Sequence, residues 1–313
     1  YWMRTAAGAL LSLPLLEPRL FPVNLGCRLA LALGALLAGA VLMVRRYVPE
    51  SPRWLLLHGR AAEAEATMQT IEESLRAEGH AVHRDHAPVT LRATGAASWL
   101  TVVRVLFGTY RRRAILSLAL MLAQAFFYNA VFFTYALVLT HFFAVQPARV
   151  GLYLVPFAVG NLLGPLVLGR LFDTVGRKPM IIATYAGSGI LLLASGVLFL
   201  SGASSAATQT VAWSVVFFVA SAAASSAYLT VSELFPVELR AMAISVFYAL
   251  GTGVGGIAGP ALFGWLIESG DPREVFGGYV LAAVLMLFAA GVAAVLGVRA
   301  EGKSLEELRL ADP

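Results

Sequence analysis

The feature that most constrains the fold is the stretch of residues 180–232, which contains no Asp, Glu, Lys or Arg. A span of the membrane needs roughly 18 or more consecutive apolar residues, so this stretch is long enough for two. Residues 201–205, Ser-Gly-Ala-Ser-Ser, supply the turn between them. Only 13% of the chain is charged, about half the fraction usual in soluble domains. The sequence therefore predicts an all-α polytopic membrane protein.

The remaining charge-free stretches indicate further spans. With the two halves of residues 180–232, they make six complete membrane-length segments, the other four at residues 114–140, 150–169, 241–267 and 275–298. Upstream, residues 29–44 are shorter and cross the membrane only if the flanking arginines extend to its interfaces. Residues 5–16 are shorter still and form a doubtful first span.

The basic residues lie between the predicted spans, where they specify topology. The net charge of +5 therefore does not indicate a nucleic-acid partner. Placing the C-terminus in the cytoplasm puts most Lys and Arg on the inner side, including the basic residues of 45–113 and Arg170, Arg177, Lys178 and Arg240. We expect a multi-pass protein of the plasma membrane, in contact with lipid and of undetermined oligomeric state.

The long polar segment, residues 45–113, is predicted to form amphipathic helices at the inner membrane face. Ser51-Pro52 is typical of a helix start, and the apolar stripe that follows extends to about Glu78. Residues 98–110 predict a second such helix. His80, His83 and His86 have a spacing that could bind metal, but no cysteine accompanies them. We predict neither a metal nor a cofactor.

A loop between two predicted spans has the pattern G-x-x-x-D-x-x-G-R-K. Gly169 would permit close helix approach, and Gly176 would permit a tight reversal of the chain. Asp173 could pair with basic groups or a helix N-terminus, while Arg177 and Lys178 would hold the loop inside. The residues predict a charge network that closes one end of a helical bundle and breaks during function.

Three motifs together resemble the major facilitator superfamily. The loop just described is similar to its signature between the second and third helices of each half. The central-loop segment resembles P-E-S-P-R-W-L, with Pro49, Glu50, Ser51, Pro52, Arg53 and Trp54. The segment from Glu233 to Arg240 resembles the E-x-x-P-x-x-x-R motif between helices ten and eleven.

The resemblance implies helices five to twelve of a twelve-helix bundle, in a truncated member lacking the first four. Within the superfamily, the long central loop looks like the organic cation/anion/zwitterion transporter family, whereas residues 302–307 look more like sugar transporters. The implied divisions are a remnant of the N-terminal bundle (1–46), a cytoplasmic central loop (47–113), a C-terminal six-helix bundle (114–298) and a cytoplasmic tail (299–313).

The resemblance implies transport of a small organic ion or amphiphile by alternating access, and no enzyme motif is found. Two alternatives stay open: a non-transporting receptor or scaffold, and a sugar-type facilitator. A cavity between two halves has only one complete wall in this chain, which favours the scaffold. The intact gate motifs oppose it. The six complete spans carry no charged residue, which argues against an ionic substrate or proton coupling in this half.

Uncharged polar residues inside the predicted spans are the candidates for contact with a solute, and their other expected role is hydrogen bonding between helices. They are Gln124, Tyr128, Asn129, Asn161, Tyr228, Tyr248 and Thr252. Phenylalanines 126, 127, 132 and 133 would supply aromatic walls.

Glycines at four-residue spacing predict close helix packing and bending. They are Gly251, Gly255 and Gly259, followed by Pro260, and Gly160 and Gly164, followed by Pro165.

Overall fold

The computed structural model describes residues 22–57, 59–78, 99–235 and 237–297, with Leu11, Pro14 and Leu15. They belong to two compact units, one formed by Arg28–Thr101 and the other by Tyr1–Cys27 with Val102–Pro313. Each unit is considered by itself. Seven helical segments in the described part are long and apolar enough to cross a membrane. The doubtful span at residues 5–16 lies mostly outside the described residues.

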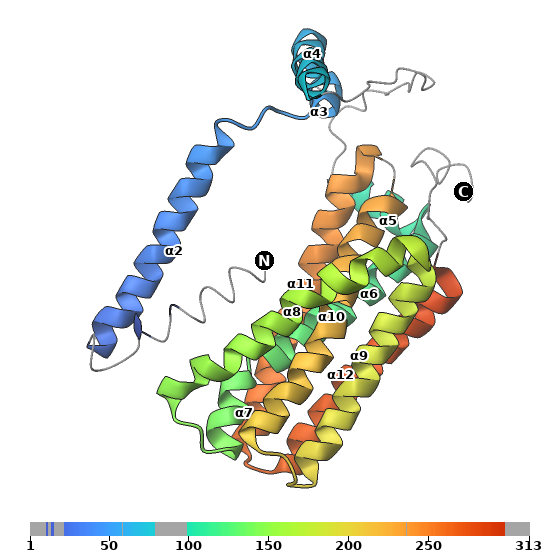
Figure 1. The fold of residues 1–313 in the computed structure, drawn as a ribbon. Coiled ribbons are helices and arrows are strands. Elements are labelled where there is room, and N and C mark those ends of the chain that lie inside the picture. Colours follow the sequence, from blue (N-terminus) through green and yellow to red (C-terminus); the bar gives the residue numbers. More distant parts are fainter. Residues whose placement is uncertain are drawn as a thin grey trace. The chain divides into compact units, whose positions relative to one another are not determined.

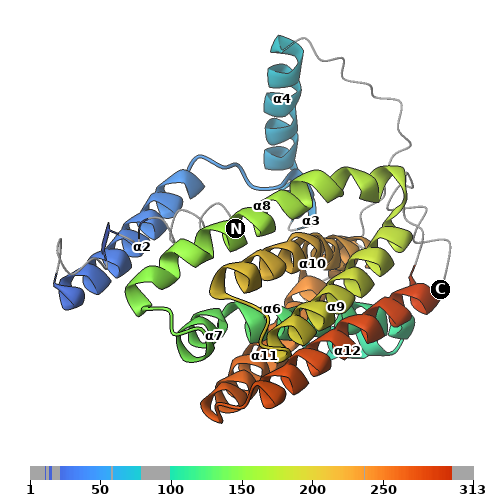
Figure 2. The same ribbon diagram turned by 60° about the horizontal axis from the view of Figure 1, so that its bottom comes forward.

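The larger unit is a bundle of helices (Figures 1 and 2). Its helices α6 and α11, α9 and α12, and α8 and α10 pack side by side. The predicted turn at residues 201–205 separates α9 from α10. The helices are α5 (Trp99–Phe107), α6 (Arg111–Phe132), α7 (Tyr135–Phe142), the short 3-10 helix η1 (Pro147–Arg149), α8 (Val150–Thr174), α9 (Arg177–Leu200), α10 (Ala206–Leu234), α11 (Val237–Glu268) and α12 (Pro272–Leu296).

The predicted span at residues 114–140 is confirmed as one membrane-length segment, Arg111–Phe142, which consists of two consecutive helices, α6 and α7. Both Phe133 and Thr134 lie outside regular helix. The hydroxyl of Thr134 donates a hydrogen bond to the carbonyl of Ala130, and such side-chain bonds to the preceding turn bend helices. The bend places α7 beyond the aromatic pair Phe132 and Phe133, which reappears at the functional site.

Glycine packing joins α11 to α6, as the four-residue spacing predicts. A methyl group added at Gly255 would lie 2.5 Å from the backbone nitrogen of Phe126, and one at Gly251 would lie 2.9 Å from the carbonyl oxygen of Met121. Gly160 and Gly164 similarly bring α8 against the backbone of α10 at Ser214 and Phe218. In lipid, where helices gain little from burying apolar surface, such close contacts drive their association.

Gly255→Ala is therefore expected to destabilise the bundle by about 1–3 kcal/mol, the usual cost of overpacking a tight contact. Gly253→Ala is the matched control, because the methyl group at Gly253 would meet nothing within 4 Å in the described part of the chain. Unfolding of the detergent-solubilised protein by heat or denaturant measures both. Equal stability of the two variants would contradict this account of the α6–α11 contact.

The smaller unit contains most of α2 (Val23–Arg45) and all of α3 (Pro52–Leu57) and α4 (Ala61–Ala77). The helix α2 is longer than residues 29–44, and α3 begins at Pro52 as predicted.

The single helix expected from Ser51 to about Glu78 is wrong, because Gly59 adopts a left-handed conformation (φ 74°) and ends α3. The amide of Arg60 donates to the carbonyl of Leu55 at 2.9 Å, which is a glycine-terminated helix end.

The second amphipathic helix, α5, packs on the bundle at its end. Leu106 is fully buried, and the ring centroids of Phe107 and Phe247 are 5.8 Å apart. The helix ends at Phe107, earlier than the predicted Tyr110, and Tyr110 instead lies edge-on to Phe235. Leu106 and Tyr110 of its apolar stripe thus contact protein. The three histidines whose spacing was considered for metal binding, His80, His83 and His86, lie outside the described residues.

Candidate solute site and gate

A hollow of about 590 Å³ lies between α6, α10 and α11. None of the described residues that line it is charged. The lining consists of Gln124, Ala125, Tyr128, Asn129, Phe132, Phe133, Ala224, Ser225, Tyr228, Tyr248, Thr252 and Gly256. Six of the seven polar candidates predicted from the sequence are thus gathered around one hollow, and their contact with a solute stays a prediction.

The seventh candidate, Asn161, is fully buried and does not line the hollow. Its side-chain oxygen accepts a hydrogen bond from the Tyr128 hydroxyl at 3.1 Å, and its amide donates to the carbonyl of Phe157 at 3.1 Å. The expectation that Asn161 faces the cavity is therefore wrong in this structure. The Asn161 side chain instead takes part in hydrogen bonding between helices, because it joins α8 to α6.

The hollow combines amide groups with aromatic faces. The Asn129 amide donates to the carbonyl of Ala125 at 2.6 Å, which orients the side chain and leaves its oxygen as an acceptor. Tyr228 and Tyr248 lie on facing helices with ring centroids 5.9 Å apart, and 39% and 47% of their surfaces are exposed. Amides and hydroxyls beside aromatic faces suit a solute that has both hydroxyl groups and apolar C–H faces.

Ser225 is the polar lining residue that the sequence reasoning missed. It lies three residues before Tyr228 on α10, and residues three apart share a helix face. The three-residue spacing from Tyr228 could therefore have identified Ser225 as a lining residue from the sequence. Its hydroxyl donates to the carbonyl of Ser221 at 2.9 Å, so it can still accept a hydrogen bond.

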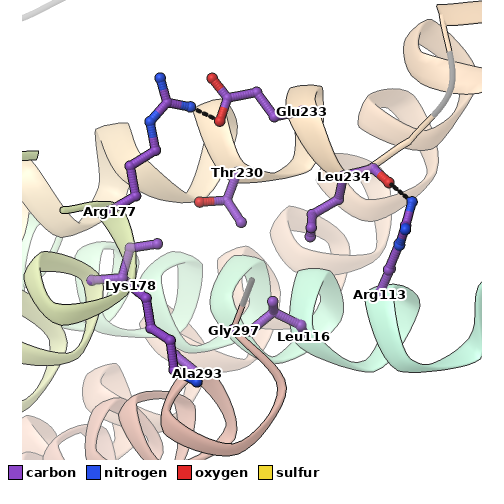
Figure 3. Close-up of a pocket in the computed structure, with 10 residues that line it drawn as sticks. Arg113, Leu116, Arg177, Lys178, Thr230, Glu233, Leu234, Ala293 and Gly297 are labelled. Atoms are coloured by element: carbon purple, nitrogen blue, oxygen red, sulfur yellow. Dashed lines mark hydrogen bonds and ion pairs between the residues drawn. The ribbon is translucent and has the colours of Figure 1, made fainter. Parts of the chain in front are cut away.

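A charged cluster lies at the end of the bundle at which α9 begins and α10 ends (Figure 3). Arg177, at the start of α9, forms an ion pair with Glu233 near the end of α10. Their side chains are 29% and 20% exposed. Next to them, Arg113 of α6 donates to the carbonyl of Leu234 at 2.8 Å. The cluster thus ties α6, α9 and α10 together.

The other residues of the predicted charge network take different positions. Asp173 lies 4.0 Å from Arg177 but is 77% exposed, so the pair is weaker than Arg177–Glu233. Lys178 lies beside Gly297, and Arg240 is half-buried near the start of α11. Their roles in gating stay predictions.

The two glycines of the loop behave differently. Gly176 has φ 114°, which L side chains rarely adopt, and it directly precedes α9. The reversal there thus needs a glycine. The close helix approach expected at Gly169 is wrong within the described structure, because an added methyl group would meet nothing within 4 Å.

The central-loop motif belongs to the smaller unit. Pro49, Glu50 and Ser51 precede α3, while Pro52, Arg53 and Trp54 form its first turn. Leu55 is buried and Trp54 is 41% exposed. A functional role for this motif stays a prediction.

Comparison with known proteins gives one family. The family model described as "Sugar (and other) transporter" matches residues 20–311. The chain belongs to the sugar (and other) transporter family. This family was the sugar-type alternative of the sequence analysis, and the match does not support the organic cation/anion/zwitterion family.

Relatives in this family are of modest identity. The chain is 28% identical over 282 residues to the putative metabolite transport protein YdjK of Escherichia coli, covering 87% of the chain and 57% of YdjK. It is 29% identical over 269 residues to the probable plastidic glucose transporter 3 of Arabidopsis thaliana, covering 83% of the chain and 51% of that protein. The chain therefore spans just over half the length of these curated relatives.

A solved structure shares the fold. The major facilitator superfamily proton:xylose symporter XylE, bound to 6-bromo-6-deoxy-D-glucose, superposes with a TM-score of 0.66 at 22% identity. The match covers 92% of this chain and 60% of XylE. The predicted fold class, an all-α polytopic membrane protein of the major facilitator superfamily, is confirmed.

Proposed function

We propose that this chain forms the solute-binding C-terminal half of a secondary transporter for uncharged, polyhydroxylated solutes such as hexoses or cyclic polyols. The observation that carries the proposal is the hollow between α6, α10 and α11, whose described lining has two amides, several hydroxyls and aromatic rings but no charged residue. A charged solute in a site of low dielectric requires a counter-charge, whereas sugar hydroxyls need only neutral donors and acceptors. The names of the relatives, which include a glucose transporter, support the same solute class.

The gated end is proposed to face the cytoplasm, and the membrane to be the plasma membrane. Basic residues are concentrated at the end of the bundle near Arg177, among them Arg111, Arg112, Arg113, Arg170, Lys178 and Arg240. At the opposite end, Arg149 ends η1 before α8, and Arg273 lies in the first turn of α12. This asymmetry is the one that orients helical membrane proteins. Solute would cross by alternate opening of the two ends around the hollow.

Uptake measurements test the proposal directly. Cells would display this chain alone, or fused behind the first four helices of a related sugar transporter, with surface protein quantified. A labelled hexose, a labelled inositol, an organic cation and an organic anion form the panel. We expect saturable hexose or inositol uptake that an excess of the organic ions does not inhibit.

Two outcomes would replace the proposal with the other candidates. Saturable uptake of the organic cation or anion, unaffected by hexose, would favour the organic-ion interpretation. Absence of all uptake from both proteins at normal surface levels would favour a receptor or scaffold. The ion pair of Arg177 with Glu233 argues against the scaffold, because a static protein needs no breakable charge pair at the end of its bundle.

A further inference from the structure

A second pocket, with a volume of about 170 Å³, lies between α8, α9 and α10. Its walls are mainly apolar, including Pro165, Phe172, Ala222 and Leu229, and one end carries Asp173, Arg177 and Thr230. Ser225 lines both this pocket and the larger hollow. The two spaces therefore share one side chain of α10 in their linings, and the proposed function gives the second pocket no role.

The part of α10 around Ser225 has only small side chains. Residues 221–227 read Ser-Ala-Ala-Ala-Ser-Ser-Ala. The Ser225 hydroxyl is turned back onto its own helix by the hydrogen bond to Ser221, so the side chain occupies little space between the two cavities. A larger residue there would fill the junction, because each added methylene must find room in a packed interior.

The second pocket ends at the gate. Arg177 and Thr230 line it and also line the small pocket drawn in Figure 3, where Arg177 meets Glu233. Glu233 follows Ser225 by eight residues, about 12 Å along the axis of α10 at the usual helical rise. A polyhydroxylated molecule in this pocket would lie against Arg177. Its hydroxyls could accept hydrogen bonds that the guanidinium otherwise gives to Glu233.

We propose that the pocket between α8 and α10 is a second, narrower subsite for the solute, entered from the hollow past Ser225, and that Ser225 acts as a size filter. The inference rests on the proposed function and deepens it. The hollow, at about 590 Å³, admits larger molecules than the pocket of about 170 Å³. Bulky glycosides should therefore bind in the hollow and inhibit uptake without being transported.

Protection of engineered cysteines from a thiol reagent can show whether the solute occupies the hollow, the second pocket or both. The chain has one cysteine, Cys27, so a Cys27→Ser background permits single reporters. Ala224→Cys reports on the hollow and Leu229→Cys on the second pocket. Ser201→Cys, in the exposed turn between α9 and α10, controls for effects of solute on the reagent. The modification rate by a small water-soluble thiol reagent is measured in reconstituted protein consisting of this chain, with and without hexose or inositol.

At hexose concentrations about ten times the dissociation constant, modification of Ala224→Cys should slow about tenfold, because the free fraction falls to about one tenth. Leu229→Cys should slow at least about twofold, because a smaller, weaker subsite is occupied less fully, and Ser201→Cys should not change. Because Ser225 also lines the hollow, each Ser225 variant is tested at about ten times its own dissociation constant for hexose, which keeps Ala224→Cys protected by occupancy. Under that condition Ser225→Leu should abolish protection at Leu229→Cys, whereas Ser225→Ala, which adds no bulk, should retain it.

The outcomes separate this inference from the function on which it rests. Protection at Ala224→Cys alone, in the background with Ser225 intact, overturns the second subsite and leaves the proposed function standing. Protection at Leu229→Cys that survives Ser225→Leu overturns Ser225 as the filter. If hexose and inositol protect neither reporter, the proposed function fails and the second subsite fails with it.

Discussion

Glu233→Gln should reduce solute uptake about tenfold or more at equal surface abundance. The substitution leaves Arg177 with a neutral partner, and a charge-assisted contact of this kind contributes about 1.5–3 kcal/mol. Because about 1.4 kcal/mol corresponds to a tenfold change in an equilibrium, the population of the state closed at this end should fall accordingly. Initial uptake rates with quantified surface protein measure the effect.

The matched control exchanges the charges. Arg177→Glu alone should be as damaging as Glu233→Gln, whereas Arg177→Glu combined with Glu233→Arg should recover part of the uptake. Asp173→Asn should reduce uptake less than Glu233→Gln, because Asp173 is 77% exposed and 4.0 Å from Arg177. A larger effect at Asp173 than at Glu233 would contradict the order of importance derived from the structure.

Asn129→Leu should raise the solute concentration for half-maximal uptake by about fivefold to 150-fold. The amide lies in the lining of the hollow with its nitrogen engaged by Ala125, so its oxygen is available to a solute hydroxyl. Losing the partner of a desolvated polar group costs about 1–3 kcal/mol, which corresponds to about that range in affinity.

Gln209→Leu controls for general damage to buried polar groups. Gln209 is fully buried on α10, outside the lining of the hollow, and its amide donates to the Ser195 hydroxyl at 3.4 Å. This variant should lower the yield or stability of folded protein while leaving the apparent affinity unchanged. If the apparent affinity of Asn129→Leu is unchanged at normal surface levels, Asn129 does not contact the solute.

The membrane-spanning architecture could be predicted from the sequence because it depends on local composition. Absence of charge over residues 180–232 suffices for two helices, since a backbone in lipid must satisfy its hydrogen bonds internally. The close helix packing at Gly251 and Gly255, although not the partner helix, was predictable for a similar reason, because a four-residue spacing places small residues on one face of a helix. The narrower family is not shown: the central-loop resemblance favoured organic-ion transporters, whereas the match is to the sugar (and other) transporter family.

Which polar residues share a cavity was decided by the tertiary structure alone. Asn161 and Asn129 look equivalent in sequence, yet the packing of α8 against α6 and α10 buries the first and leaves the second in the hollow. The principal partner of Arg177 likewise depended on the fold, since Glu233 is far away in sequence while Asp173 is one helical turn away. Composition and spacing act within one helix and can be read from the chain. Burial and pairing arise between helices, so they depend on how those helices rotate and pack.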